Sequence, residues 1–247
     1  MLAFLLGTSL AHAASGADIA AQLESWRAQR GLDTAPKIDA SVYQAALNGE
    51  ISKGIEVVED IKAAKGYAVA VFDIPIEQLW KAIADEDHHA NNLAVQVSET
   101  VQGTPRTHDH TLFQFLDVPM VSDRWWLVNI RYTASLYTQS NGKLWELTWR
   151  DRNKDQALID TLDLSQFDDA MPVAWTKGAW LLLKLSDGRT LIEYHTWSDP
   201  GGSVPVGIAT RFAASEVANN LAHMAKFARN HTPTCTGTFH RPDGSAM

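Results

Sequence analysis

The sequence predicts an α+β fold in which a curved antiparallel β-sheet wraps around one long C-terminal α-helix. Strand-like segments dominate residues 93–197 and are joined by short connectors rich in turn-forming residues. A long helical segment, residues 205–229, follows them with no proline after its first position. A sheet with one apolar face needs a cover, and this last helix is the element available to provide it.

Helices are expected to precede the sheet. Residues 15–18 (SGAD) are similar to a capping box with Asp in place of Glu, which predicts a helix start. Pro75 is expected in the first turn of another helix, where its missing N–H has no cost. The expected elements in this part of the chain are a helix over 15–30, a helix over 41–48, a strand over 66–74 and a helix over 76–85.

The sheet itself is predicted to be a meander of consecutive antiparallel strands. Asn141–Gly142 and Ser186–Asp187–Gly188 are typical of tight turns between paired strands. Strands joined in this way run antiparallel. The expected strands are 93–101, 107–116, 125–137, 144–150, 175–185 and 190–197.

Composition excludes several classes of protein. The chain has 247 residues, of which 45% are hydrophobic and 20% are charged, so an extensive core is expected without crosslinks. A formal net charge of −8 argues against a nucleic acid as partner. Cys235 is the only cysteine, which excludes an intramolecular disulfide and a zinc-finger cluster.

The N-terminus has the pattern of an export signal. A short apolar run, LAFLLGTSL, precedes Ala11–His12–Ala13, which has the small-x-small pattern of a signal peptidase site. A periplasmic or secreted location is therefore expected, the alternative being a cytoplasmic protein with an apolar N-terminus. No later stretch is long and apolar enough to span a membrane. The expected organisation is a signal peptide (1–13), an N-terminal helical extension (14–51), a ligand-binding domain (52–230) and a flexible tail (231–247).

Nine tryptophans exceed the eight phenylalanines and five tyrosines, and most of them fall on expected strands. In residues 144–150, Trp145, Leu147 and Trp149 alternate with polar residues, so they share one face. Core packing explains most single tryptophans. Together they suggest the wall of an apolar pocket. The tryptophans in or at the start of strand segments are Trp125, Trp126, Trp145, Trp149, Trp175, Trp180 and Trp197.

No catalytic arrangement is recognisable. His108 and His110 have a spacing that could ligate a metal, but neither they nor the pair His88–His89 has a third ligand that can be placed nearby, so all are read as exposed polar residues. The nucleophile elbow and the glycine-rich phosphate loops do not occur. Ser203 is read as the N-cap of the last helix. The sequence therefore predicts no catalytic residue, no metal and no cofactor.

Three segments together resemble one family. They are residues 66–85 (a strand, then Pro75 and a helix ending in Trp-x-x-x-x-Asp), residues 117–126 (DVPMVSDRWW), and residues 178–205 with their Gly–Ala–Trp and Asp–Pro–Gly–Gly strings, followed by the long last helix. The chain resembles a START (steroidogenic acute regulatory protein-related lipid transfer) domain of the helix-grip superfamily over about residues 52–230.

The resemblance implies a tunnel for one lipid or sterol between the sheet and the last helix. Sterol-binding relatives often carry an inward arginine where this chain has Ile130, so a neutral or largely apolar ligand is expected. Asp123 and Arg124 are expected to form an exposed ion pair in a turn, the alternative being a role in shaping the tunnel mouth. The expected ligand-contacting residues are Trp126, Val128, Ile130, Trp145, Leu147, Trp149, Leu181, Leu183, Tyr194, Ile208, Phe212, Val217, Leu221 and Met224.

Binding and carriage of a hydrophobic small molecule, with transient membrane contact and no nucleic acid, is the first hypothesis. An enzyme of the same superfamily, cyclase- or hydrolase-like, is the alternative; Thr148, Arg150, Glu193 and Tyr194 are the available polar candidates. A third possibility is an interaction module with a collapsed cavity.

Overall fold

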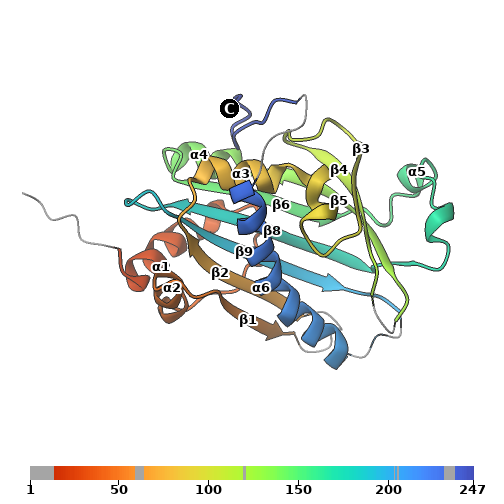
Figure 1. The fold of residues 1–247 in the computed structure, drawn as a ribbon, viewed down its shortest axis with the longest axis horizontal. Coiled ribbons are helices and arrows are strands. Elements are labelled where there is room, and N and C mark those ends of the chain that lie inside the picture. Colours follow the sequence, from red (N-terminus) through yellow and green to blue (C-terminus); the bar gives the residue numbers. More distant parts are fainter. Residues whose placement is uncertain (1–13, 59–63, 119–120, 203, 205, 231–236) are drawn as a thin grey trace, which may run out of the picture.

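The computed structural model describes residues 14–58, 64–118, 121–202, 204, 206–230 and 237–247; of residues 64, 91, 206, 208, 209 and 211–213 it describes the backbone only. Within these ranges, one curved sheet of nine strands is the centre of the molecule, and helix α6 lies across its inner face (Figure 1). The expected α+β helix-grip fold is confirmed.

The strands follow the order β1-β2-β9-β8-β6-β5-β4-β3, and every neighbouring pair on this path is antiparallel. A short β7 pairs with β5 in parallel at the side. The strands are β1 (Ser52–Val57), β2 (Ala64–Phe72), β3 (Val97–Gln102), β4 (His110–Leu116), β5 (Arg124–Tyr132), β6 (Leu144–Asp151), β7 (Met171–Pro172), β8 (Trp175–Lys184) and β9 (Thr190–Asp199).

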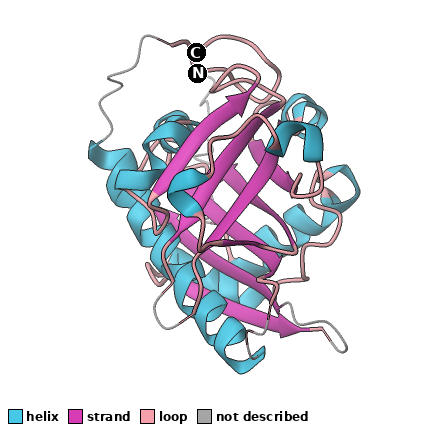
Figure 2. Ribbon diagram, turned by 90° about the vertical axis from the view of Figure 1, so that its right-hand side faces the viewer, coloured by secondary structure: helices cyan, strands magenta, loops and turns pink. Residues whose placement is uncertain are grey.

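Helices lie on both sides of the twisted sheet (Figure 2). The α-helices are α1 (Gly16–Ser25), α2 (Ala40–Leu47), α3 (Ile76–Ala84), α4 (Ala134–Gln139), α5 (Gln156–Ile159) and α6 (Val206–Asn230); the 3₁₀ helices are η1 (Arg27–Gln29), η2 (Glu86–Asn91) and η3 (Ser165–Phe167). The predicted capping box is present at α1, where the Ser15 and Asp18 side chains each bond to the other residue's backbone N–H.

Alternation along the strands divides the apolar residues between two faces. Inner-face residues of the sheet pack with α3 and α6 into the main core, at whose centre Trp80 is fully buried. On the outer face, α1 and α2 cover one end of the sheet. Residues of the segment that carries α5 and η3 cover the other end, against Phe113, Trp125 and Leu127. The sheet is therefore covered on both faces, with a gap in the outer layer between these two covers.

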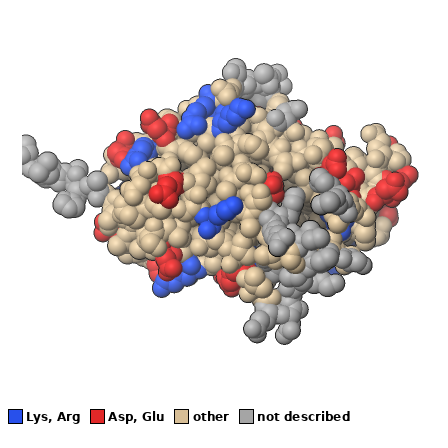
Figure 3. Space-filling model, turned by 60° about the horizontal axis from the view of Figure 1, so that its bottom comes forward, with Lys and Arg blue, Asp and Glu red and all other residues tan. Residues whose placement is uncertain are grey.

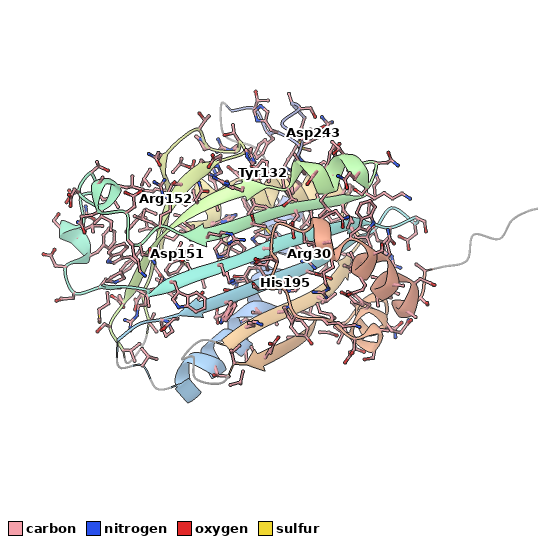
Figure 4. All side chains as sticks on the ribbon, turned by 180° about the vertical axis from the view of Figure 1, so that it is seen from behind. Arg30, Tyr132, Asp151, Arg152, His195 and Asp243 are labelled. Carbon is pink, nitrogen blue, oxygen red and sulfur yellow. The ribbon has the colours of Figure 1, made fainter. Side chains whose placement is uncertain are left out.

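Two buried carboxylates attach the N-terminal helical extension to the outer face. Arg30 is 5% exposed, and its guanidinium contacts Glu146 on β6 at 3.2 Å and Glu193 on β9 at 3.0 Å. Tyr43 of α2 also donates to Glu193, at 2.6 Å, and His195 contacts the same carboxylate at 2.8 Å. Figure 4 shows Arg30 and His195 side by side on this face. The extension is thereby bound to the central strands.

The structure differs from the sequence prediction at several boundaries. The first helix ends at Ser25 and the 3₁₀ helix η1 follows it. Strand β3 begins at Val97 because residues 92–96, which follow η2, form a turn and bends. The expected strand over 125–137 ends at Tyr132, and α4 follows it before the turn at Asn141–Gly142, where both φ angles are positive. Strand β1 was not predicted, because an edge strand that pairs only with β2 needs no continuous apolar pattern.

The end of the chain packs on the molecule rather than extending into solvent. Phe239 is 5% exposed within the main core, and the indole N–H of Trp80 donates to the His240 carbonyl oxygen at 2.8 Å. The prediction of a flexible tail over 231–247 is therefore not met in residues 237–247. Residues 231–236, with Cys235, lie outside the described part, as do residues 1–13 of the predicted signal peptide.

Candidate ligand-binding site

The strand register brings inner-face side chains from different strands into rows. Trp149 on β6 lies between Ile130 on β5 and Gly178 on β8. In the next row, Trp180 on β8 lies between Leu147 on β6 and Tyr194 on β9. Aromatic rings from three adjacent strands therefore meet on the face that α6 covers.

These rings form a flat apolar floor. The ring centroids of Trp149 and Tyr194 are 5.8 Å apart with planes at 27°, and those of Trp180 and Tyr194 are 4.2 Å apart. Gly178 makes room for this arrangement, because a Cβ atom there would come within 2.1 Å of the Trp149 ring. Trp149 and Tyr194 are only partly buried, unlike most of the inner face around them. Apolar rings that remain partly open under a covering helix are typical of a binding site.

A second partly buried tryptophan is oriented by hydrogen bonds. The Trp126 indole N–H donates to Oε1 of Gln114 at 2.8 Å, and the Gln114 amide donates to the Ser98 hydroxyl at 3.1 Å. These two hydrogen bonds connect β5 to β4 and β4 to β3, and they hold the Trp126 ring on the inner face.

Neutral polar groups stand between the floor and α6. The amide of Asn220 on α6 is 3.4 Å from the Tyr194 hydroxyl, and burial raises the pKa of Tyr194 to about 12, so its phenol is neutral at physiological pH. Asn220 Oδ1 is buried and accepts no hydrogen bond from any described group. A ligand group that donates a hydrogen bond would satisfy it.

The loop that leads from β9 toward α6 is tied to β5. Arg124 is 5% exposed, and its Nε donates to the Pro200 carbonyl oxygen at 2.7 Å. The prediction of an exposed ion pair between Asp123 and Arg124 is wrong, because the Asp123 carboxylate accepts from the Val118 N–H instead. Ser203, predicted as the N-cap of α6, lies outside the described residues.

Most of the residues expected to contact ligand share the inner core. It contains Trp126, Val128, Ile130, Trp145, Leu147, Trp149, Tyr194, Val217, Leu221 and Met224. Leu181 and Leu183 point to the outer face, where they pack with α1 and α2, so their expected place beside α6 is wrong. The inward residues of β8 are Trp180 and Leu182, and the mistake arose because both faces of this strand are apolar. The side chains of Ile208 and Phe212 lie outside the described part.

A buried polar group behind the floor was missed. His110 was read as exposed, but its side chain is fully buried on the inner face, 3.5 Å from the buried carboxylate of Glu86, and Tyr132 lies close by. Burial lowers the pKa of His110, but the Glu86 carboxylate outweighs this effect and the pKa is raised. His108 is exposed and its Nδ1 accepts from the Tyr132 N–H at 3.1 Å, so the two histidines do not share a face.

The polar candidates for catalysis do not converge. Tyr194 faces inward, whereas Thr148, Arg150 and Glu193 lie on the outer face. Glu193 is part of the contact with Arg30, and its role there is to attach the N-terminal extension. Within the described ranges no cluster of three or more His, Cys, Asp or Glu residues is placed to hold a metal ion, and no helix is long and apolar enough to cross a membrane.

Comparison with known proteins gives similarity in structure only. No family model matches the chain, and no curated protein matches it in sequence. A STAR-related lipid transfer protein from Xanthomonas axonopodis is 18% identical with a TM-score of 0.59, over 72% of this chain and 93% of that one. Human STARD10 is 12% identical with a TM-score of 0.56, over 81% and 84% of the two chains. Human StAR-related lipid transfer protein 5 is 11% identical with a TM-score of 0.54, over 87% and 97%. The chain has the fold of these START domains.

Proposed function

We propose that this START-fold chain binds one hydrophobic small molecule, a lipid or a sterol-like compound, between the inner face of the sheet and α6. The observation that carries the proposal is the partly buried aromatic floor of Trp149 and Tyr194, with Trp126 on the same face. Each 100 Å² of apolar ligand surface buried there contributes about 2.5 kcal/mol, so an apolar ligand gains most of its affinity from contact area alone.

The ligand is proposed to be neutral. The polar groups described beside the floor are the Tyr194 phenol, the Asn220 amide and the Gln114 amide, none of which carries a charge. On the inner face of β5, position 130 holds Ile130 and not an arginine, and the guanidinium of the buried Arg124 at the start of the strand is bound to the Pro200 carbonyl oxygen. Transport or sequestration of such a ligand requires its uptake from a membrane or another carrier, and transient contact with a membrane is part of the proposal.

Native mass spectrometry and organic extraction of the purified protein test the proposal. The expected result is a co-purifying lipid or sterol-like compound, or binding of one from a panel of such compounds. Absence of both would overturn it. Chemical conversion of the bound compound would instead support an enzyme of the same fold.

Two matched variants place the ligand. Trp126→Arg puts a charge on the inner face and is expected to lower affinity at least about tenfold, because a buried charge without a partner is costly. Trp175→Arg makes the same change on the outer face of β8, where Trp175 packs on Trp197, and is expected to leave affinity unchanged. Equal affinity of both folded variants would contradict the placement.

Export is proposed from the Ala11–His12–Ala13 pattern. The expected result is recovery of the protein outside the cytoplasm with Ala14 as its first residue, measured by cell fractionation and N-terminal sequencing. Recovery of the uncleaved chain in the cytoplasm would contradict it.

A further inference from the structure

A groove opens on the outer face of the sheet, in the gap between the N-terminal extension and the cover that carries α5. Its volume is about 630 Å³, within the range of small-molecule sites. Figure 4 shows this face, with Arg152 and Asp151 at the end of β6 and the Arg30 contact farther along the sheet. The groove is lined by Gln102, Asp109, Thr111, Asn129, Arg131, Thr148, Arg150, Asp151 and Arg152, and by His110, whose side chain is buried on the inner face and whose carbonyl oxygen accepts from the Asn129 amide. It is on the opposite face from the aromatic floor, so it is a separate site.

Two positively charged side chains face each other on neighbouring strands beside this groove. Arg150 on β6 lies directly opposite Lys177 on β8, and both point outward. The same row continues to Trp197 on β9 and Lys65 on β2. Like charges directly opposite each other on neighbouring strands destabilise a sheet. The row therefore places positive charge where an anion would relieve the repulsion.

The side chain of Lys177 is held in this row by an aromatic ring. Its ammonium lies 4.6 Å from the centroid of the Trp197 ring, and the Lys65 ammonium is 4.7 Å from the same centroid. Burial lowers the pKa of Lys177, and Arg150 and Lys65 lower it further against the opposite effect of Asp33. The Lys65 ammonium is paired with the Glu56 carboxylate at 2.9 Å. The positive charge of the row is therefore concentrated at Lys177 and Arg150.

The carboxylates of Asp33 and Asp109 make only long contacts with the arginines of the groove. Arg150 contacts Asp33 of the N-terminal extension at 3.6 Å, and Arg131 contacts Asp109 at 3.7 Å; all four side chains are at least half exposed. Both distances exceed that of a hydrogen bond. Arg152 differs, because it is bound to Gln102, Thr111 and Asp155 and forms a wall of the groove. Arg131 Nε donates to Oδ1 of Asn129 at 3.0 Å and Arg150 Nη2 donates to the Gly31 carbonyl oxygen at 3.4 Å, so the other N–H groups of the two guanidiniums are available to a ligand.

We propose that Arg150 and Arg131, which line this groove, bind the phosphate group of a soluble small molecule there, and that Lys177, which lies opposite Arg150 beside the groove, adds positive charge. A phosphate has enough acceptor oxygens to take hydrogen bonds from two guanidiniums together. Asp33 then acts as the internal counter-ion that the phosphate displaces. A soluble source is favoured over a lipid headgroup because the site is recessed between two covering segments. The proposal does not depend on the interior site, and either can fail alone.

Isothermal titration calorimetry with inorganic phosphate tests the proposal. The double variant Arg150→Gln/Lys177→Gln is expected to bind phosphate at least about tenfold more weakly than the unmodified protein. Asp33→Asn is expected to bind about threefold more tightly, because it removes the competing carboxylate. Lys184→Gln is the matched control: it removes a half-exposed cation from the same strand β8, far from the row, and is expected to bind like the unmodified protein.

Circular dichroism and thermal melting establish that each variant is folded. Absence of phosphate binding, or equal binding by the double variant and Lys184→Gln, would overturn the proposal. The source is tested with vesicles of phosphatidylcholine, with and without phosphatidylglycerol. Binding to the anionic vesicles without binding of inorganic phosphate would overturn the assignment to a soluble ligand.

Discussion

The indole of Trp149 lies directly over the backbone of Gly178. A Cβ atom at residue 178 would come within 2.1 Å of the indole ring and within 2.2 Å of the His195 carbonyl oxygen. Glycine at this position therefore lets the ring extend across β8 and stack on Tyr194. The aromatic floor depends on a residue that contributes no side chain to it.

Gly178→Ala is expected to destabilise the protein by about 1–3 kcal/mol, because the added methyl group has no space, and to displace the Trp149 ring. Urea unfolding measures the first effect and tryptophan fluorescence the second. Gly207→Ala is the control, since a Cβ atom there meets nothing within 4 Å. It is expected to stabilise α6 by about 0.5–1 kcal/mol. Equal stability of the two variants would contradict this account of Gly178.

Arg30→Met is expected to cost about 3–5 kcal/mol of unfolding free energy, because it leaves Glu146 and Glu193 buried without their cation. Faster proteolysis within residues 14–51 should accompany it. The control is Arg27→Met at the start of η1, which ends just before Arg30. The contact of Arg27 with Glu24 is partly exposed and is worth less than about 1 kcal/mol. A small effect of Arg30→Met would show that the extension is held by its apolar contacts alone.

Stability is expected to fall in two steps as the pH is lowered. Burial lowers the pKa of His195, so the unfolded chain takes up this proton more readily and stability declines below about pH 6.5. Burial alone would raise the pKa of Glu193, but Arg30 and its other partners lower it to about 2. Its contribution is present above about pH 4.3 and is lost as the pH falls from there to about 2.

His195→Gln isolates the first step, because glutamine can still donate to Glu193 but does not titrate. Denaturant unfolding across this pH range should show a shallower decline just below about pH 6.5 and an unchanged decline below about pH 4.3. His110 works in the opposite direction: its pKa is raised, so its contribution is present at low pH and is lost as the pH rises through the raised value. An unchanged slope in His195→Gln would contradict the assignment of the first step.

Phe239→Ala is expected to cost about 3–5 kcal/mol, because the ring is buried in the main core at the end of the chain. Thr238→Ala, at the exposed neighbouring position, is expected to change stability by less than about 0.5 kcal/mol. Thermal unfolding compares the two. Similar melting temperatures for both variants would mean that residues 237–247 do not contribute to the core.

The sequence predicted the sheet, the last helix and most of the inner face because these features are periodic. Alternation in β6 assigned Trp145, Leu147 and Trp149 to one face without knowledge of the fold. The same rule failed in β8, where Leu181, Leu182 and Leu183 are consecutive and apolar, so that only the packing of α1 and α2 distinguishes the faces.

Contacts between distant residues were beyond prediction. Arg30 meets carboxylates that are 116 and 163 residues away, and Arg124 meets a carbonyl oxygen 76 residues away. His89 and His110 were read as exposed polar residues, but both are buried. One signal was available: His110 occupies the inner position of a strand whose alternate residues include Leu112. Polar residues at inward positions of a strand indicate a buried partner.

Arg30 reaches partners on β6 and β9, which are separated by β8, so its contact exists only after these three strands have assembled. Docking of the N-terminal extension therefore follows the pairing of these strands, although the extension precedes them in the sequence. A chain that loses residues 14–51 would expose Glu146 and Glu193 without their cation, within an apolar strip of the sheet. The extension therefore binds the outer face only when β6, β8 and β9 are correctly paired.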